Sequence, residues 1–158
     1  GVAYAGQMSD PTRSYYAGWS LVVVYATPDV DQDVTLYDGG AWIASGSSST
    51  FAFEGRADRL GRIGVVAWEG DRGSGGGDTL SLGSTLLTPR RADGTTGNKN
   101  DAFSSTAMGS GFNNSLGVDA TSFGAVPLTD GINRLTAGTA GDQYLIGAVT
   151  VTSIGVAK

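Results

Sequence analysis

The residues best suited to chemistry are three carboxylates around a glycine-rich stretch. Glu69 and Asp71 precede the stretch 73–77, and Asp78 follows it. Hard cations such as Ca²⁺ bind several carboxylate and carbonyl oxygens, and a loop of this composition supplies both. The spacing matches neither an EF-hand nor an RTX nonapeptide. Two interpretations stay open: a Ca²⁺ site formed by Glu69, Asp71 and Asp78, or a solvated hairpin loop whose Asp side chains cap turns.

Two other sets of aspartates lie in different sequence contexts. Asp29, Asp31 and Asp33 occupy alternate positions, so in an extended chain their carboxylates share one face and need a cation or full solvation. Pro28 favours a turn, and therefore solvation, at this point. Asp119 follows an apolar residue, and a half-buried carboxylate needs a backbone, Arg or metal partner. We expect Asp119 to serve structural hydrogen bonding.

The composition makes catalysis an unfavoured interpretation. The chain has no His and no Cys, which excludes a Ser-His-Asp triad, a Cys nucleophile, a disulfide and an ordinary zinc site. A glycosidase-type carboxylate pair would have to combine Glu69 with Asp71 or Asp119. A Ser–Lys pair would need Lys99 or Lys158, in a polar loop and at the chain end. We therefore expect a protein that is not an enzyme, with no catalytic residues and no cofactor other than Ca²⁺.

The aromatic residues offer a different kind of site. Exposed Trp and Tyr side chains stack on the apolar faces of sugars. Trp19, Trp42 and Trp68 all fall within or beside apolar stretches, and we expect core packing for Trp19 and Trp68. Tyr15 and Tyr16 precede the first apolar stretch and are expected to be exposed. A carbohydrate-binding surface is thus an alternative to a structural role.

The composition also limits the fold and the partners. Of 158 residues 26 are Gly, whereas Glu occurs only at 54 and 69 and Lys only at 99 and 158. Helix surfaces are usually built from Glu and Lys, and Gly supplies the positive φ of turns, so β structure is favoured. The net charge of -5 argues against nucleic acid as a partner. No stretch approaches the roughly 18 apolar residues of a membrane span, and no signal peptide is evident.

Apolar or alternating stretches recur at intervals of about ten residues, with turn residues between them. Residues 19–26 are the strongest and predict a central strand that is covered on both faces. Residues 62–68 predict a second core strand, and residues 89–105 a long surface loop. A turn is expected at 38–40. The other expected strands are 34–37, 41–43, 51–53, 79–82, 84–87, 115–120, 132–136 and 143–154.

This pattern predicts one all-β domain over residues 1–158. Short strands separated by turns are typical of an antiparallel β-sandwich or a jelly roll, here with long Gly-rich loops.

Five stretches resemble, in the same order, a module of known proteins. They are residues 16–25 (Tyr-Ala-Gly-Trp-Ser-Leu-Val-Val-Val-Tyr), 34–39, 64–71, 114–119 and 141–144. The sequence is similar to a β-rich module of large secreted bacterial cell-surface proteins that is often found ahead of DUF11-type repeats. The similarity covers most of the chain, and its first and third stretches are specific. It implies an extracellular module of adhesive or filamentous proteins, with no assigned enzymatic activity.

The chain departs from that family at its beginning. Further strands usually precede the Tyr-Ala-Gly-Trp-Ser-Leu stretch, and here about fifteen residues do. A sandwich short of strands exposes an unpaired edge or an open apolar groove. Either another segment or subunit fills it, with Gly1–Gln7 or the terminal strand as the donor, or the chain uses a smaller sheet.

We therefore expect a non-enzymatic extracellular structural or adhesive module of the bacterial surface, with filament formation by strand complementation as the sharper hypothesis. Its expected partners are copies of itself or other surface-protein domains. The alternative is a surface recognition module that binds carbohydrate or Ca²⁺.

Overall fold

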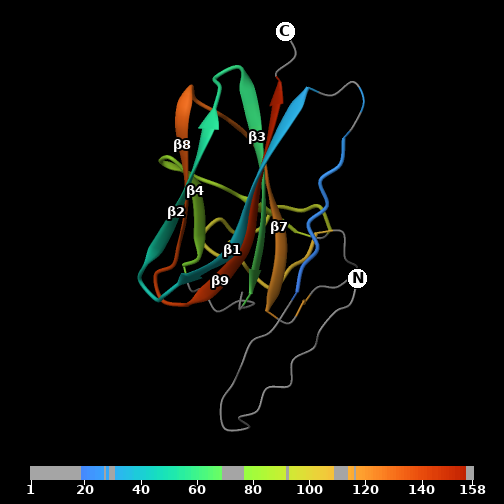
Figure 1. Ribbon diagram of the computed structural model, residues 1–158. Helices are drawn as coiled ribbons and strands as arrows, with labels where there is room; N and C mark the ends of the chain where they lie inside the picture. The colour runs from blue at the N-terminus through green and yellow to red at the C-terminus, as the bar shows by residue number, and fades with distance from the viewer. Residues whose placement is uncertain are drawn as a thin grey trace.

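The computed structural model describes residues 19–26, 28, 31–68, 77–91, 93–108, 114–115 and 117–155, which form two facing antiparallel β-sheets (Figure 1). The predicted fold class, an all-β sandwich, is confirmed. No helix in this described part of the chain is long and apolar enough to cross a membrane.

The two sheets contain nine strands in the described residues. One sheet has the order β1-β9-β3-β7-β6, and the other has the order β2-β8-β4-β5. The strand bounds are β1 Gln32–Ile43, β2 Ser48–Gly55, β3 Arg59–Trp68, β4 Thr79–Leu82, β5 Thr85–Leu86, β6 Pro89–Arg90, β7 Val118–Pro127, β8 Gly131–Gly138 and β9 Tyr144–Gly155.

The core lies between the sheets and follows from strand periodicity. Along β3 the side chains of Ile63 and Val65 point inward and are buried, while Arg62 between its buried neighbours points outward and is exposed. Leu80 and Leu135 approach from the four-stranded sheet and are fully buried. Alternating inward and outward side chains place one apolar face of each sheet against the other, which is the basis of a sandwich.

The predictions for β3 and β9 are confirmed. β3 contains residues 62–68, and β9 contains nearly all of 143–154. β9 lies between β1 and β3 and pairs with both, so in this chain the terminal strand completes its own sheet. Donating it to a neighbour would remove a central strand, which counts against the terminal strand as the donor in strand complementation.

The turn predicted at 38–40 is wrong. β1 continues through this region, and its register against β9 shifts between Asp38 and Ala41. Gly39 has a φ of 129°, which is accessible to glycine and strained for other residues. Two glycines between two alternating stretches are compatible with a turn or with a β-bulge, and here they form a bulge inside one strand.

The surface loop predicted over 89–105 is wrong in part. Pro89 and Arg90 form the short strand β6, which pairs with β7. Phe103 is fully buried, and its ring centroid lies 6.2 Å from that of Phe123 and 4.9 Å from that of Tyr144. The loop is polar in composition, but this one aromatic side chain anchors it in the core.

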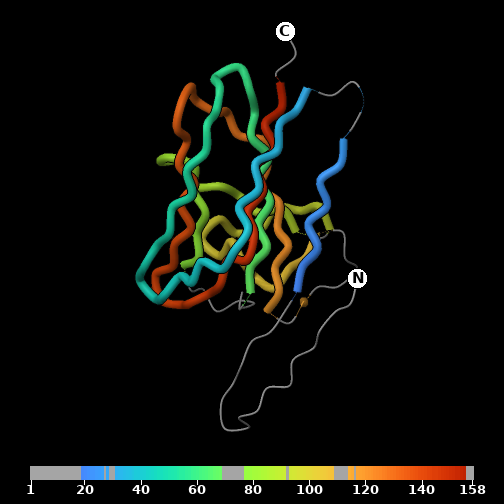
Figure 2. Tube along the Cα trace, viewed as in Figure 1, coloured from blue at the N-terminus to red at the C-terminus, as the bar shows by residue number. Residues whose placement is uncertain are grey.

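The prediction for residues 19–26 is wrong. They form no strand and lie outside both sheets, as Figure 2 shows for the blue segment. The structure thus leaves the most strand-like sequence of the chain uncovered, and with it Trp19, which was expected in the core.

Candidate functional site

Of the predicted Ca²⁺ ligands, one lies within the described residues. Glu69 and Asp71 lie outside the described residues. Asp78 is 2% exposed, and its backbone carbonyl accepts a hydrogen bond from the Ala102 amide at 2.9 Å. Burial, together with the charge of Asp78, raises the pKa of the Tyr144 hydroxyl. Asp78 is therefore part of the interior, and within the described ranges no group of three or more potential metal-ligating side chains occurs.

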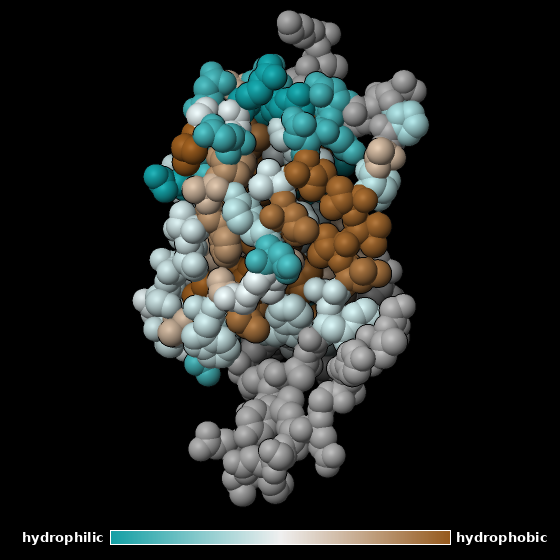
Figure 3. All heavy atoms as spheres, viewed as in Figure 1, coloured by the Kyte–Doolittle hydropathy of each residue, from teal (hydrophilic) through white to brown (hydrophobic). Residues whose placement is uncertain are grey.

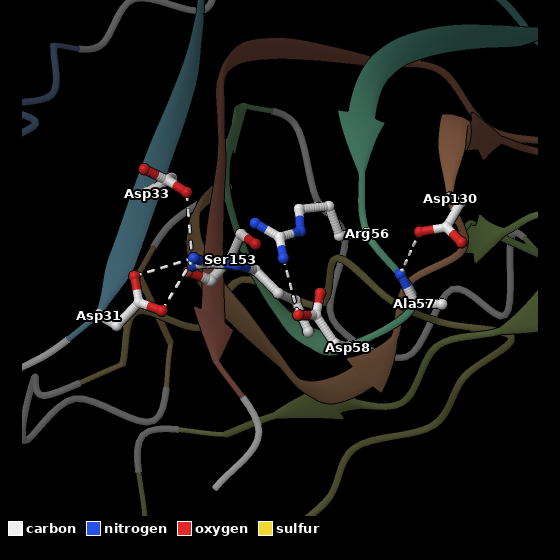
Figure 4. Close-up of polar contacts among 8 residues, drawn as sticks. Asp31, Asp33, Arg56, Ala57, Asp58, Asp130 and Ser153 are labelled. Carbon is white, nitrogen blue, oxygen red and sulfur yellow. Dashed lines mark hydrogen bonds and ion pairs between the residues drawn. The ribbon is translucent and has the colours of Figure 1, made fainter. Parts of the chain in front are cut away.

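The acidic stretch around residue 31 has a cationic partner from the chain itself. Nη2 of Arg59 lies 2.8 and 2.9 Å from the two carboxylate oxygens of Asp31, and Nη1 lies 3.4 Å from Asp33 (Figure 4). The Arg59 side chain is only 8% exposed, and its hydrogen bond to Asp31 is the main cause that raises its pKa. Asp33 lies in β1, so the expected turn is wrong there, but the Asp31 and Asp33 side chains are 77% and 79% exposed and thus solvated as expected. Asp29 lies outside the described residues.

This ion pair fixes the start of β1. The Gly155 amide donates to the Asp31 carbonyl at 3.1 Å, and Arg59 Nη1 donates to the Ser153 carbonyl at 3.3 Å. Nη2 of Arg59 thus contacts both oxygens of Asp31, while Nη1 contacts Asp33 and Ser153, so the guanidinium joins the start of β1 to β9. The chain therefore enters β1 in a set orientation against β9 and β3.

Asp119 has the structural role that its apolar context predicted. It is fully buried, and its two carboxylate oxygens accept the backbone amides of Ser105 at 3.2 Å and Thr106 at 2.8 Å. Burial raises the pKa of this carboxyl to about 6, and the charge of Asp101 contributes in the same direction. Ser105 adopts a φ of 53°, which is uncommon for a residue other than glycine, and the Asp119 contacts help to hold it.

The loop that Asp119 holds covers the outer edge of β7. The Met108 amide donates to the Ala120 carbonyl at 2.9 Å, and the Ala120 amide donates to the Thr106 carbonyl at 3.0 Å. Further along, β6 pairs with Phe123 and Ser122. These contacts occupy backbone groups that an edge strand would otherwise offer to another chain.

The opposite edge of the same sheet is open. β1 pairs with β9 on one side, and no strand of the described part of the chain pairs with its other side. Val34 and Leu36 point away from the core here and are exposed. The bulge after Asp38 ends the regular pairing, which leaves the stretch Gln32–Asp38 as a regular seven-residue edge.

The outer face next to this edge carries an apolar segment. Residues 19–26, the exposed segment, lie over the face of the five-stranded sheet that points away from the four-stranded sheet (Figure 1). A groove of about 250 Å³ separates the two, and residues 22–25 line one side of it. The opposite side is formed by residues of three strands, namely Gln32, Val34, Arg62, Thr150, Thr152 and Ile154.

The exposed segment places large apolar side chains in solvent. Five of its side chains are 58–78% exposed, and Val34 and Leu36 of β1 are exposed beside them. Figure 3 shows a hydrophobic surface, in brown, on this side of the molecule. These five are Trp19, Leu21, Val23, Val24 and Tyr25. Single exposed apolar residues are normal, but a contiguous group marks an interaction surface.

The other two tryptophans differ from each other. Trp68 is half-buried, as predicted, and its ring covers Gly147 so closely that a Cβ there would lie 1.7 Å from Cζ3 of the ring. Trp42 is largely exposed near the end of β1. Tyr15 and Tyr16 lie outside the described residues.

Sequence reasoning anticipated an unpaired edge but not that it is the outer edge of β1, and it missed the role of Arg59. A signal was present for both. Residues 21–24 are four consecutive apolar residues without the alternation that marks β1, β2 and β3, and Arg59 opens an apolar stretch where an unpaired charge would be costly.

The comparisons with known proteins give a distant likeness. No family model and no curated protein matches the sequence. Among solved structures, dimeric latent PorU from Porphyromonas gingivalis is similar over 82% of this chain, with 15% sequence identity and a TM-score of 0.47. The chain spans 14% of the length of that protein. A likeness at this level indicates neither a family nor a function.

Proposed function

We propose that this chain is a non-enzymatic structural or adhesive module of the bacterial cell exterior that associates with other protein domains, including copies of itself, through its five-stranded sheet. One observation carries the proposal. An apolar segment of strong strand formers lies exposed beside a sheet edge that no described strand covers.

The physical basis is the chemistry of an edge strand. Such a strand presents unpaired N–H and C=O groups, and an added strand satisfies them while its side chains continue the sheet surface. At the other end of the sheet, the outer side of β7 is occupied by the two-residue edge strand β6 and by backbone hydrogen bonds to residues 106 and 108. The five-stranded sheet thus has one covered edge and one open edge, so another strand can be added at the β1 edge only.

The extracellular location rests on the sequence resemblance to secreted surface proteins. The absence of Cys and the low charged content are compatible with that location. Association through backbone pairing and apolar contact also fits a protein whose composition lacks His and Cys.

Size-exclusion chromatography with light scattering, combined with negative-stain imaging over a range of concentrations, tests the proposal. We expect multimers whose size increases with concentration. Because each copy carries a net charge of -5, added salt should favour them by screening repulsion. A protein that stays monomeric at every concentration and salt would contradict self-association.

A glycan-binding surface is the second candidate, because Trp19, Tyr25 and Trp42 expose their aromatic rings. Binding to a glycan array should then be lost in Trp42→Ala and retained in a control such as Leu86→Ala, which removes an exposed side chain of the other sheet. If a Ca²⁺ ion takes part, a chelator should lower both the glycan signal and the melting temperature. Equal binding by the two variants would contradict this candidate.

A further inference from the structure

The exposed segment and the open β1 edge have complementary properties. We propose that residues 19–26 of one copy add as a strand to the outer edge of β1, over Gln32–Asp38, in a second copy of this chain. This inference rests on the proposed function and assigns its donor and its acceptor, neither of which is the terminal strand or Gly1–Gln7.

The donor has the properties of an added strand. Val22, Val23 and Val24 are β-branched, and the aromatic residues Trp19 and Tyr25 flank them. Such residues favour extended backbone and pack well on a pleated surface. The segment contains no charged residue and no proline, the two devices that usually prevent strand addition. It is exposed and forms no strand ladder among the described residues.

The acceptor is the outer edge of β1, which no strand in the described part of the chain pairs with. The outer edge of β7 is occupied by β6 and by the 104–108 loop. In the four-stranded sheet, the Tyr37 hydroxyl donates to the Ala52 carbonyl of edge strand β2, and the other edge strand, β5, has two residues. β1 offers seven residues in regular register before its bulge, which matches an eight-residue donor.

The position of the segment favours a second copy over the same chain. The groove beneath residues 22–25 is lined by Thr150 of β9 and Arg62 of β3, so the segment lies over the sheet face and not beside its own β1. The ion pair of Asp31 with Arg59 holds the start of β1 in this arrangement. The intramolecular edge therefore stays open, and the same chain supplies a strand that fits it.

Side-chain chemistry supports the same pairing. An added strand beside β1 extends the outer face, where the Val34 and Leu36 side chains are exposed and Ile154 lines the groove. Aliphatic and aromatic side chains of the donor would cover these residues, and neighbours across strands stabilise a sheet by such contacts. The donor and the acceptor are different surfaces of the chain, so each copy offers one of each. Repeated contacts between copies therefore form either an open filament or a closed ring.

Cysteine cross-linking tests the pairing, because the chain contains no native Cys. A Val23→Cys variant is mixed with a differently tagged variant that carries Cys at position 34, 35 or 36 in turn, and the mixture is oxidised. Neighbouring strands bring Cα atoms to disulfide distance. We expect a disulfide between the two tags for at least one position, about tenfold above the pairing of Val23→Cys with Thr85→Cys, which places the thiol on the exposed β5 strand.

Two further variants separate failure of the donor assignment from failure of the proposed function. Val23→Asp should abolish multimers, whereas Thr85→Asp should leave them unchanged, because a charge disrupts a pairing strand. If the Val23→Asp variant forms the same multimers as the wild type and no tagged pair cross-links, the protein self-associates through another surface and this inference is overturned. If Val23→Cys/Thr35→Cys in one chain forms an internal disulfide and mixed chains form none, the segment pairs with its own β1 and the inference is again overturned.

Discussion

The two edges of the five-stranded sheet are built in opposite ways. At the β7 side, the buried Asp119 carboxylate holds the loop 104–106. The Ala120 amide donates to the Thr106 carbonyl, and the Ala120 carbonyl accepts from the Met108 amide. At the β1 edge, seven regular residues have no described strand beside them, and an apolar segment lies over the adjoining face. The chain therefore closes one edge with polar sequence and leaves apolar sequence next to the other.

The contrast shows that the hydrophobicity of a segment does not by itself decide whether the segment is buried. The loop that contains Phe103 is polar, yet its backbone groups find partners and its one ring fills the core. The exposed segment is far more apolar, yet its backbone has no ladder in the described structure. Burial of a strand requires hydrogen-bond partners as well as apolar side chains. An apolar segment without them is suited to supplying a strand to another molecule.

The largest effect is expected from truncating the anchor of the closed edge. Phe103→Ala removes a fully buried ring that contacts Phe123 and Tyr144, and should lower the free energy of unfolding by about 3–5 kcal/mol. The matched change Leu21→Ala, in the exposed segment, should alter it by less than about 0.5 kcal/mol. Urea unfolding of dilute protein measures both values.

Phe103→Leu keeps most of the buried volume and serves as the milder variant if Phe103→Ala does not fold. It should cost less than Phe103→Ala because less buried apolar volume is lost. A similar loss in Phe103→Ala and Leu21→Ala would mean that the exposed segment is packed in the monomer, and the contrast between the two edges would fail.

The next effect concerns pH at the closed edge. Burial raises the pKa of Asp119 to about 6 in the folded state, from an ordinary value of 3.8. Between these values the folded chain keeps a proton that the unfolded chain has lost. The contribution of Asp119 to stability is therefore complete below pH 3.8 and is lost as the pH rises through 6, by roughly 3 kcal/mol in all.

Urea unfolding at pH 4 and pH 7 measures this loss when the wild type is compared with Asp119→Asn. The other titrating groups contribute equally to both proteins, so their effect cancels in the difference. The wild type should lose stability relative to Asp119→Asn on going from pH 4 to pH 7. An identical pH dependence in the two proteins would show that Asp119 titrates in the ordinary range.

The fold class and the two central strands were predictable because β3 and β9 have long β-branched sequences between turn residues. The backbone role of Asp119 was predictable because a carboxylate in apolar sequence needs a donor. The bulge at Gly39 was not predictable, since two glycines permit a turn or a bulge. The partner of Asp31 was not predictable either, because Arg59 is 28 residues away in sequence and only the sheet register brings the two together.

The predicted placement of residues 19–26 failed for a physical reason. Periodicity reports which faces of a segment are apolar, and a continuous apolar stretch reads as a strand that is covered on both faces. It does not report whether the chain supplies the strands and layers that would cover it. At the candidate site, residues 19–26 have a strong preference for strand structure, but no described strand of the chain pairs with them.

The smallest effect is expected at the start of the open edge. Asp31→Asn removes one charge from the pair with the nearly buried Arg59 and leaves Asp33 as its partner at 3.4 Å. The melting temperature should fall by a few degrees at low salt, and by less at high salt because ions screen the remaining interaction. Asp58→Asn is the control, since Asp58 pairs at 2.9 Å with an Arg56 whose side chain is 65% exposed, and exposed pairs contribute little.

Because Asp31 also holds the start of β1, its loss should increase internal cross-linking in the Val23→Cys/Thr35→Cys chain if the ion pair keeps the exposed segment away from its own edge. Equal cross-linking with and without Asp31→Asn would show that the open edge does not depend on this ion pair.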